Sequence, residues 1–471
     1  MNIIIIFILI LSVFRYKYSP TYIDADYIII DLIITLALIF IYINVNKGRF
    51  NNILVSHSSI FFISYIIVYF QYDIDLVLDN IQATNALAWQ FERGVCRSIC
   101  LSNAALASYT LALNNCSYKP NSQKAFIDNI SPNLIHKIAF LSQIGFLLFV
   151  DKDFLLGGYS KVPMGGIASQ FEEMMQMSLI ALFAIISYNV RIIVKHKQKV
   201  KQSYLLFMNF FRKPLFLTIV YIIMLSMAGA RYAVLRMILI VAISYLYAFR
   251  IKVPKLTIIV AFIIASTLFT LQGLSRNGKN ELTESVNVLN ERKSISPMTS
   301  ELAFSVTASH IAISEVPESY DYNKGITFLP YFLLLIPGMR GLFYTLFNIP
   351  PEMLSSSHYI TYLGLGTLDN FGVGSSSIAD IYISFGVIGV IILIYIFGFI
   401  LRKIEYATFC NNYTSPYLLA FSYCSYSQML YANRESILTI FTGVPYVLLF
   451  IYIAIYSSKK KSKTNESNHM C

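Results

Sequence analysis

The sequence predicts an all-α polytopic membrane protein, a bundle of about twelve transmembrane helices with one large loop on the outer side. The composition is 56% hydrophobic and only 13% charged, whereas average globular chains carry about 25% charged residues. The apolar residues form separate blocks, many of them long enough to cross a bilayer. The charges between these blocks also alternate in sign along the chain, which is typical of loops on opposite sides of a membrane.

The expected spans follow from the length and polarity of each block. They lie near residues 1–14, 27–45, 53–71, 94–113, 134–150, 176–194, 214–228, 232–249, 255–272, 376–401, 417–431 and 436–456. The first block is short for a hydrocarbon core of about 30 Å at about 1.5 Å per residue. It lacks the basic start and small-residue cleavage site of a signal peptide, so we do not expect cleavage.

The charge distribution orients the bundle with both termini in the cytoplasm. Residues 195–213 and 250–255 and the tail carry clusters of lysine and arginine. The loops expected on the other side are acidic, with Asp73, Asp75, Asp79 and Glu92 in one and Asp151, Asp153, Glu172 and Glu173 in another. Basic residues favour the cytoplasmic side. The net charge of +11 therefore reflects orientation, and we expect no nucleic-acid partner.

Four regions follow along the chain: an N-terminal membrane region 1–272 of about nine spans, a large outer loop 273–375, a C-terminal membrane region 376–456 of three spans, and a basic cytoplasmic tail 457–471. The loop contains an apolar piece, residues 326–347, that prolines interrupt. Two more spans are possible there, but the prolines favour an interfacial or re-entrant element.

Three arginines stand at outer ends of expected spans, namely Arg231, Arg276 and Arg434, and Arg236 lies about one turn deeper than Arg231. Arginine is costly in hydrocarbon and often marks a pathway or a partner. Its planar fork matches phosphate oxygens and stays charged. We therefore expect these four side chains to bind a lipid pyrophosphate. Snorkelling to the interface, or pairing such as Arg434 with Glu435, is the structural alternative.

His358 and Asp380 are the candidate catalytic residues. His358 and a second outer histidine, His310, lie in the large loop, and a histidine can accept a proton near neutral pH. Asp380 follows a Gly- and Ser-rich loop and stands in the first turns of the span 376–401. The carboxylate can act as a base or as a buried partner of an arginine, and we expect the loop to bring it toward the arginines.

Other polar residues have a structural interpretation. Asp31, in the second span, has the same two interpretations as Asp380, a base or a buried pairing partner. We expect Asp24 and Asp26 to cap the second helix rather than to act in catalysis. Cys96 and Cys100 stand one turn apart in an apolar segment and are expected to be packing residues. The sequence has no metal-ligand pattern and no nucleotide-binding or hydrolase motif, so we expect neither metal nor cofactor.

Several segments together resemble the Wzy-type polymerases of O-antigen or capsule repeat units. They are the outer turn Gly229-Ala230-Arg231, Leu274-Ser275-Arg276 at the end of the ninth span, the long outer loop, the stretch from Gly374 to Gly386, and Arg434-Glu435-Ser436. In two places the sequence departs from the pattern. His358 fits only loosely the local pattern of the loop histidine in related ligases, and Asp380 stands where glutamate is more common.

The resemblance implies a reaction on the outer face of the bacterial inner membrane. A growing glycan on undecaprenyl pyrophosphate is transferred to a hydroxyl of a new lipid-linked repeat unit, and undecaprenyl pyrophosphate leaves. The arginines would stabilise the charge on the leaving group without a metal. The resemblance also implies membrane lipid, a flippase and a chain-length regulator as partners.

Other membrane functions stay open. A lipid-linked oligosaccharide flippase is the main alternative, although the long outer loop and the few intramembrane charges disfavour it. An O-antigen ligase, or a C-type sugar transferase that uses Asp24 and Asp26, is also compatible with the sequence.

Overall fold

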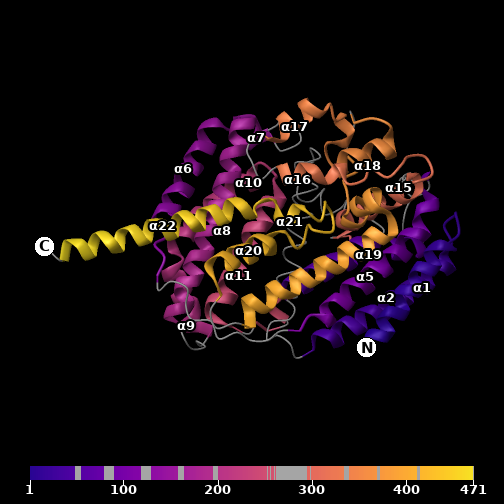
Figure 1. The fold of residues 1–471 in the computed structure, drawn as a ribbon, viewed down its shortest axis with the longest axis horizontal. Coiled ribbons are helices and arrows are strands. Elements are labelled where there is room, and N and C mark those ends of the chain that lie inside the picture. Colours follow the sequence, from indigo (N-terminus) through magenta and orange to yellow (C-terminus); the bar gives the residue numbers. More distant parts are fainter. Residues whose placement is uncertain are drawn as a thin grey trace. The chain divides into compact units, whose positions relative to one another are not determined.

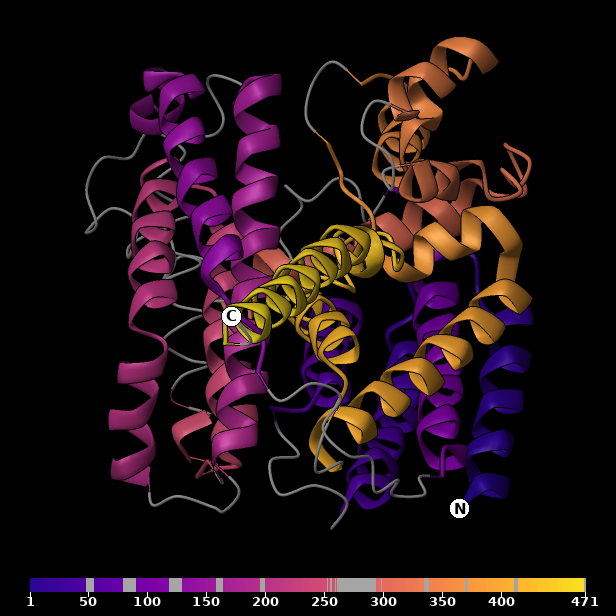
Figure 2. The same ribbon diagram turned by 60° about the vertical axis from the view of Figure 1, so that its left-hand side comes forward.

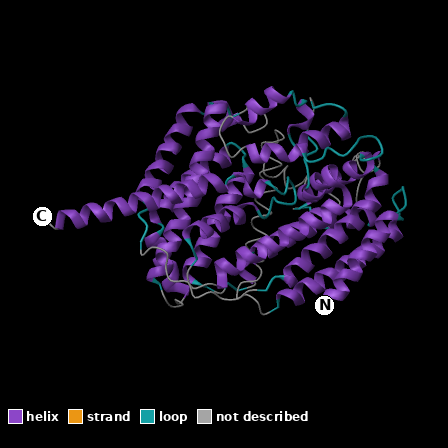
Figure 3. Ribbon diagram, viewed as in Figure 1, coloured by secondary structure: helices purple, strands orange, loops and turns teal. Residues whose placement is uncertain are grey.

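The computed structural model describes residues 1–47, 55–78, 90–117, 129–157, 164–194, 200–251, 253–254, 256–258, 260, 294–297, 299–333, 339–368, 372–410 and 414–469. In these ranges the chain is helical and contains no strand (Figure 3). The predicted all-α class is therefore confirmed.

The longer helices are α1 Asn2–Lys17, α2 Ala25–Asn46, α3 His57–Val77, α5 Glu92–Asn115, α6 Asn133–Phe149, α8 Gly166–Ile193, α9 Val200–Phe210, α10 Arg212–Met227, α11 Arg231–Phe249, α19 Ser377–Glu405, α20 Pro416–Gln428 and α22 Val444–His469. Shorter elements are α7 Lys152–Gly157, α14 Ser300–Ala303, η2 Phe304–Val306, α15 Thr307–Glu315, η3 Ile326–Phe328, α16 Leu329–Leu333, α17 Met339–Phe347, η4 Pro351–Leu354, α18 Ser356–Leu365, η5 Tyr406–Cys410 and α21 Thr439–Thr442.

A helix stands at each expected span that the structure describes, but only some of these helices are both long and apolar enough to cross a membrane by themselves. Six are, within the described residues: α2, α3, α8, α11, α19 with η5, and α21 with the first part of α22. The bent pair α9–α10 makes a seventh if it forms one span. The chain is thus multi-pass, and the total of twelve stays a prediction. The ninth expected span, 255–272, lies almost wholly outside the described residues.

Two helices extend beyond the spans expected for them. The third span was expected to end near residue 71, yet α3 continues to Val77, so Asp73 and Asp75 lie in the helix and not in the following loop. The sixth span was expected to begin near residue 176, but α8 begins at Gly166 and includes Glu172 and Glu173. In both cases the acidic residues suggested a loop, although the helix continues through them.

The helices group into two compact units, each of which is described here by itself. Unit 1 comprises Met1–Tyr118, Val286–Lys403 and Met429–Thr442, and unit 2 comprises Lys119–Ser285, Ile404–Gln428 and Gly443–Cys471. Each unit therefore combines segments that are far apart in the sequence.

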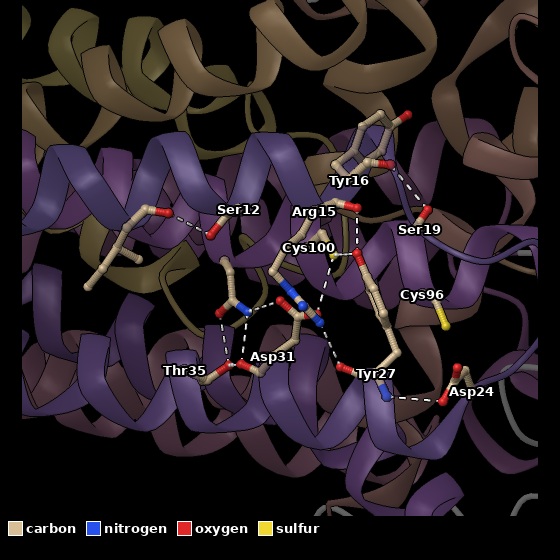
Figure 4. A network of polar contacts seen from close by, with 12 residues as sticks. Ser12, Arg15, Tyr16, Ser19, Asp24, Tyr27, Asp31, Thr35, Cys96 and Cys100 are labelled. Atoms are coloured by element: carbon tan, nitrogen blue, oxygen red, sulfur yellow. Dashed lines mark hydrogen bonds and ion pairs between the residues drawn. The ribbon is translucent and has the colours of Figure 1, made fainter.

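In unit 1, α1 and α2 pack along α5, and α15 packs against the same helix (Figure 1). A buried polar network joins the first three of these helices (Figure 4). Arg15 donates to Asp31 at 2.8 Å and stacks on the Tyr27 ring at 3.9 Å, and the amide of Asn103 donates to the backbone carbonyl of Asp31. Asp31 is thus a buried pairing partner, one of its two predicted interpretations, because its charge is neutralised within the fold.

In unit 1, the expected cap at Asp24 and the expected packing residues are also confirmed, whereas Asp26 stands in the first turn of α2. Asp24 is the N-cap of α2 and accepts a hydrogen bond from the Tyr27 backbone amide at 3.1 Å. Cys96 and Cys100 are fully buried in α5. These residues stabilise helix ends and helix contacts, which are structural roles.

In α19 the backbone is broken at Gly386, whose φ of 65° and ψ of −162° are not helical. The backbone amide of Asn323 donates to the carbonyl of Ile383 at 2.9 Å, next to this break. A broken helix needs such substitute partners for its freed carbonyls. The short first half, from Ser377 to Phe385, carries Asp380.

The apolar piece 326–347 forms η3, α16 and α17, with residues 334–338 outside the described part. Each of these elements is too short to cross a core of about 30 Å. The interfacial or re-entrant placement expected for this piece stays a prediction.

In unit 2, α8 is the central helix and packs against α6, α11, α20 and α22. Helices α6, α8, α10 and α11 run roughly side by side, in purple to pink in Figure 2. The N-terminal ends of α8 and α11 and the C-terminal end of α10 are the ends that the charge pattern assigns to the outer side. The site described next lies one to two turns inside these ends.

Candidate functional site

The predicted site residues are divided between the two units. Arg231 and Arg236 are in unit 2, and His358, Asp380 and Arg434 are in unit 1. Arg276 lies outside the described residues.

In unit 2, a tight turn positions the first two arginines. Helix α10 ends at Met227 and α11 begins at Arg231. Gly229 takes a φ of 75°, a conformation that glycine adopts at no steric cost, and the Ala230 amide closes the turn onto the carbonyl of Leu225 at 2.8 Å. Arg231 is buried, with 8% of its surface exposed, at the start of α11.

Arg236, on the second turn of α11, has a buried guanidinium with one edge that lacks a hydrogen-bond partner among the described residues. Only 6% of its surface is exposed. Its Nη1 donates to Oε1 of Gln176 at 2.6 Å, and the Tyr232 ring lies 5.2 Å from Cζ. Nε and Nη2 have no hydrogen-bond partner in the part of the chain that the structure describes. These two nitrogens form the fork that binds carboxylate or phosphate oxygens in pairs.

A chain of hydrogen bonds continues from Arg236 to a carboxylate. Gln176 donates through Nε2 to the hydroxyl of Tyr221 at 3.1 Å, and that hydroxyl donates to Oε1 of Glu172 at 2.5 Å. Gln176 and Glu172 come from α8 and Tyr221 from α10, so three helices contribute to one network. In each of these three hydrogen bonds, the donor is on the Arg236 side and the acceptor is on the Glu172 side.

Glu172 and Arg236 do not form a direct ion pair, although their charges are close enough to interact. Tyr221 and Gln176 stand between them. Glu172 is partly exposed, and its Oε2 has no partner among the described residues. An open carboxylate oxygen and an open guanidinium edge therefore belong to the same network.

Arg236 was predicted from the sequence, but the other three residues of its network were not. Glu172 was assigned to an outer loop, and neither Gln176 nor Tyr221 was singled out. One signal was present, because Glu172 and Gln176 are four residues apart and share a helix face. Nothing in the sequence placed Tyr221 beside them.

In unit 1, Asp380 lies in a group of hydroxyls. The carboxyl is fully buried, and Ser436 donates to its Oδ2 at 2.5 Å. The hydroxyls of Ser356 and Thr327 lie near the same carboxyl, without hydrogen-bond geometry to Oδ1. Tyr331 lies beside this group and is partly exposed. Such a group can exchange hydrogen bonds with the hydroxyls of a sugar.

The Gly- and Ser-rich loop before α19 is fixed by hydroxyl contacts. Ser376 and Ser309 are joined at 2.8 Å, and Ser377 and Tyr69 at 3.0 Å. The Ile378 amide donates to the Tyr69 hydroxyl at 3.0 Å. These contacts hold the start of α19 against α3 and α15.

The other two predicted residues of unit 1 are near the surface. His358 is exposed in the first turn of α18, where Ser355 caps its backbone amide. Arg434 is 3.7 Å from Glu301, and both side chains are about one third exposed. Within unit 1, Asp380 thus meets hydroxyls, whereas Arg434 pairs with another acid. The catalytic and binding roles of these residues stay predictions.

The other outer histidine, His310, forms a buried pair with Asp73. Its Nε2 is 3.9 Å from Oδ1 of Asp73, and both side chains are fully buried. No hydrogen bond reaches either ring nitrogen or either carboxylate oxygen from the described residues. Burial lowers the pKa of His310 to about 3, which keeps the imidazole neutral at ordinary pH.

No group of three or more potential metal ligands occurs among the described residues. The network of Glu172, Tyr221, Gln176 and Arg236 has one carboxylate and one cation, which suits an anionic ligand better than a metal ion.

Comparison with known families identifies the chain. The family model for the O-antigen polysaccharide polymerase Wzy matches residues 1–465. The protein belongs to the Wzy family. No curated protein and no solved structure gives a significant match.

Membership of the Wzy family confirms the resemblance seen in the sequence and implies a polymerase that makes glycosidic bonds. It also agrees with the multi-pass helical fold, since six or seven of the described helices are suited to cross a membrane. The roles of individual residues in this Wzy protein follow from the geometry above and are proposed below.

Proposed function

We propose that this protein polymerises undecaprenyl-pyrophosphate-linked oligosaccharide repeat units into a surface polysaccharide, O-antigen or capsule. Transfer takes place on the outer face of the bacterial inner membrane, with both termini in the cytoplasm. A flippase supplies the lipid-linked units, and a chain-length regulator acts with the polymerase.

The proposal rests on Nε and Nη2 of Arg236, which have no hydrogen-bond partner among the described residues. An unpaired buried cation is costly, so an anionic ligand stabilises the site when it binds. A pyrophosphate offers oxygens that can accept from Nε and Nη2 together. The same contacts strengthen as negative charge grows on the leaving group, which lowers the barrier to transfer without a metal.

The remaining predicted residues have roles consistent with this reaction. Arg231 precedes Arg236 on the same helix and, with Arg276 and Arg434, is proposed to contact the lipid pyrophosphate. The hydroxyl group around Asp380 is proposed to orient a sugar. Because both substrates are held in one membrane plane, positioning contributes a large part of the rate.

The test replaces Arg236 by glutamine in a deletion strain complemented with the full-length gene. We expect loss of the long polysaccharide ladder, with single repeat units still displayed and normal amounts of protein in the membrane. Arg191→Gln is the matched control, because Arg191 is a buried arginine of the same unit whose Nη1 donates to the backbone carbonyl of Tyr247. It should change stability and not chain length.

Alanine at Arg231, Arg276 or Arg434 should also abolish the ladder. Wild-type chain length in the Arg236 variant and in all three alanine variants would refute the pyrophosphate assignment. The deletion strain also separates the functions: loss of the ladder with single units retained indicates a polymerase, loss of all outer units indicates a flippase, and intact polymer that is not attached to its carrier indicates a ligase.

A further inference from the structure

We propose that Glu172 is the proton acceptor of the transfer reaction and takes the proton of the acceptor hydroxyl on Oε2. This proposal rests on the proposed function, since it assumes that Arg236 binds the pyrophosphate of the donor. It assigns the base to unit 2, in place of His358 and Asp380.

The carboxylate of Glu172 has the geometry of a general base. A general base must have a lone pair that can reach the substrate, and it must be held in position. Glu172 meets both requirements, because Tyr221 fixes Oε1 at 2.5 Å while Oε2 is without a partner in the described chain and the side chain is partly exposed.

The other two candidates each lack one of these properties. Asp380 is held by Ser436 but is fully buried. His358 is exposed, and only its backbone amide has a hydrogen bond in the described structure, so nothing fixes its ring. Glu173, the neighbour of Glu172, is exposed and likewise has no hydrogen bond that orients its carboxylate among the described residues.

Glu172 is also kept apart from Arg236. A direct ion pair would occupy the carboxylate and the guanidinium edge at once. Tyr221 and Gln176 stand between the two groups and bind only Oε1 and Nη1. The network thus holds both charged groups and leaves Oε2 of Glu172 and the Nε–Nη2 edge of Arg236 without a hydrogen-bond partner among the described residues.

The acceptor hydroxyl gives its proton to Oε2 of Glu172, and its oxygen bonds to the anomeric carbon of the donor glycan. The bond from that carbon to the pyrophosphate oxygen breaks, and its electron pair leaves with undecaprenyl pyrophosphate. The new charge lies against Nε and Nη2 of Arg236, and Glu172 later returns its proton to water.

In this scheme Gln176 and Tyr221 are positioning residues. Gln176 orients the guanidinium through Nη1, and Tyr221 orients the carboxylate through Oε1. Tyr221→Phe keeps the ring and removes only the hydroxyl. We expect it to slow transfer while donor binding changes little, because the carboxylate then rotates freely.

The experiment uses full-length protein in nanodiscs and in the complemented deletion strain. Glu172→Gln is the central variant, since Tyr221 can still donate to the amide oxygen and the fold is preserved. A positioned base contributes about 10²–10⁴-fold to a rate, so we expect a loss of that size. Binding of undecaprenyl pyrophosphate, measured directly, should stay within about twofold of wild type on the assumption that the base adds nothing to binding the leaving group.

Three further variants make the result specific. Glu173→Gln should behave as wild type, and Glu172→Asp should restore part of the rate. Arg236→Gln should lose undecaprenyl pyrophosphate binding, so failure of the donor site and failure of the base give different results.

The wild-type rate should fall as acid protonates Glu172, and Glu172→Gln should remove that dependence. The titratable and charged groups facing Glu172 are Tyr221, Arg236 and Glu173.

Two outcomes would overturn the assignment. A full-length polysaccharide ladder in Glu172→Gln shows that the carboxylate is not needed. Loss of both transfer and undecaprenyl pyrophosphate binding in that variant, with the protein folded, shows that Glu172 supports the donor site and is not the base.

Discussion

At the scale of single residues, this protein contains buried acids of two kinds. Asp31 accepts two hydrogen bonds from Arg15, and its backbone carbonyl is bound by Asn103, so its charge is balanced and the network is structural. Asp73 has no hydrogen-bond partner in the described chain and lies 3.9 Å from His310. Unpartnered buried polar groups are costly, so this pair should be sensitive to its protonation.

His310 should make the protein less stable in acid. Burial lowers its pKa to about 3, and Tyr72 and Asp73 of α3 are the titratable groups near it. Between pH 6.5 and 3 the unfolded chain therefore binds the extra proton, and stability falls with falling pH by about 1.4 kcal/mol per pH unit. The free energy of unfolding should drop by about 2 kcal/mol from pH 7.5 to pH 5 through this one group.

Thermal unfolding of purified protein in nanodiscs measures this effect. His310→Gln should flatten the pH dependence in that range. His358→Gln is the control, because His358 is exposed and its loss should leave the slope unchanged. An unaltered slope in His310→Gln would contradict the expected titration.

At the scale of single elements, the break in α19 separates a short N-terminal half from the rest of the span. Gly386 has a backbone conformation that other residues rarely adopt, and a Cβ there would lie 3.1 Å from the hydroxyl of Tyr322. Gly386→Ala should therefore cost on the order of 1–3 kcal/mol. Because the N-terminal half carries Asp380, polymer formation should fall as well.

Gly366→Ala provides the matched control for this prediction. Gly366 also has a positive φ, of 70°, but a Cβ there meets nothing within 4 Å. Its substitution should cost about 1 kcal/mol from the left-handed backbone alone. Equal melting temperatures and equal polymer lengths in the two variants would mean that the break in α19 has no special role.

Elements also show how far the sequence could predict the site. The turn between α10 and α11 was predictable, because Gly229-Ala230-Arg231 is too short to be anything else between two apolar blocks. The cap at Asp24 was also predictable, because aspartate directly before an apolar block is a typical helix N-cap. The partners of Arg236 and Asp380 were not, since Tyr221 and Ser436 reach them through helix packing, which no local pattern encodes.

The C-terminal end of α3 and the N-terminal end of α8 were predicted only in part. Acidic residues near an apolar block suggest a loop, and Asp73 and Glu172 were assigned that way. Both lie in helices, because the fold buries Asp73 and because Tyr221 of a neighbouring helix donates a hydrogen bond to Glu172. Polar residues indicate which part of a helix avoids contact with lipid, but they do not indicate where the helix ends.

At the scale of the whole molecule, the burial of α5 by other parts of the protein predicts that this helix crosses the membrane. It is too polar to qualify as a span on hydropathy, yet its residues from Gly94 to Leu113 are buried on nearly every side. A helix that is covered by protein does not need an apolar surface. With the N-terminus in the cytoplasm, α5 should run from the outer side to the cytoplasmic side.

Reporter fusions test this crossing. Alkaline phosphatase joined after residue 78 should be active, and green fluorescent protein joined after residue 117 should fluoresce, because one reporter works only outside and the other only in the cytoplasm. Fusions after residues 47 and 24 control the orientation of α2, which is apolar enough to span by itself. Active phosphatase after both 78 and 117 would show that α5 returns to the outer side, and every later segment would then face the membrane the opposite way. The basic segment 200–213 would lie outside, which the positive charge makes unfavourable, so we expect the fluorescent result.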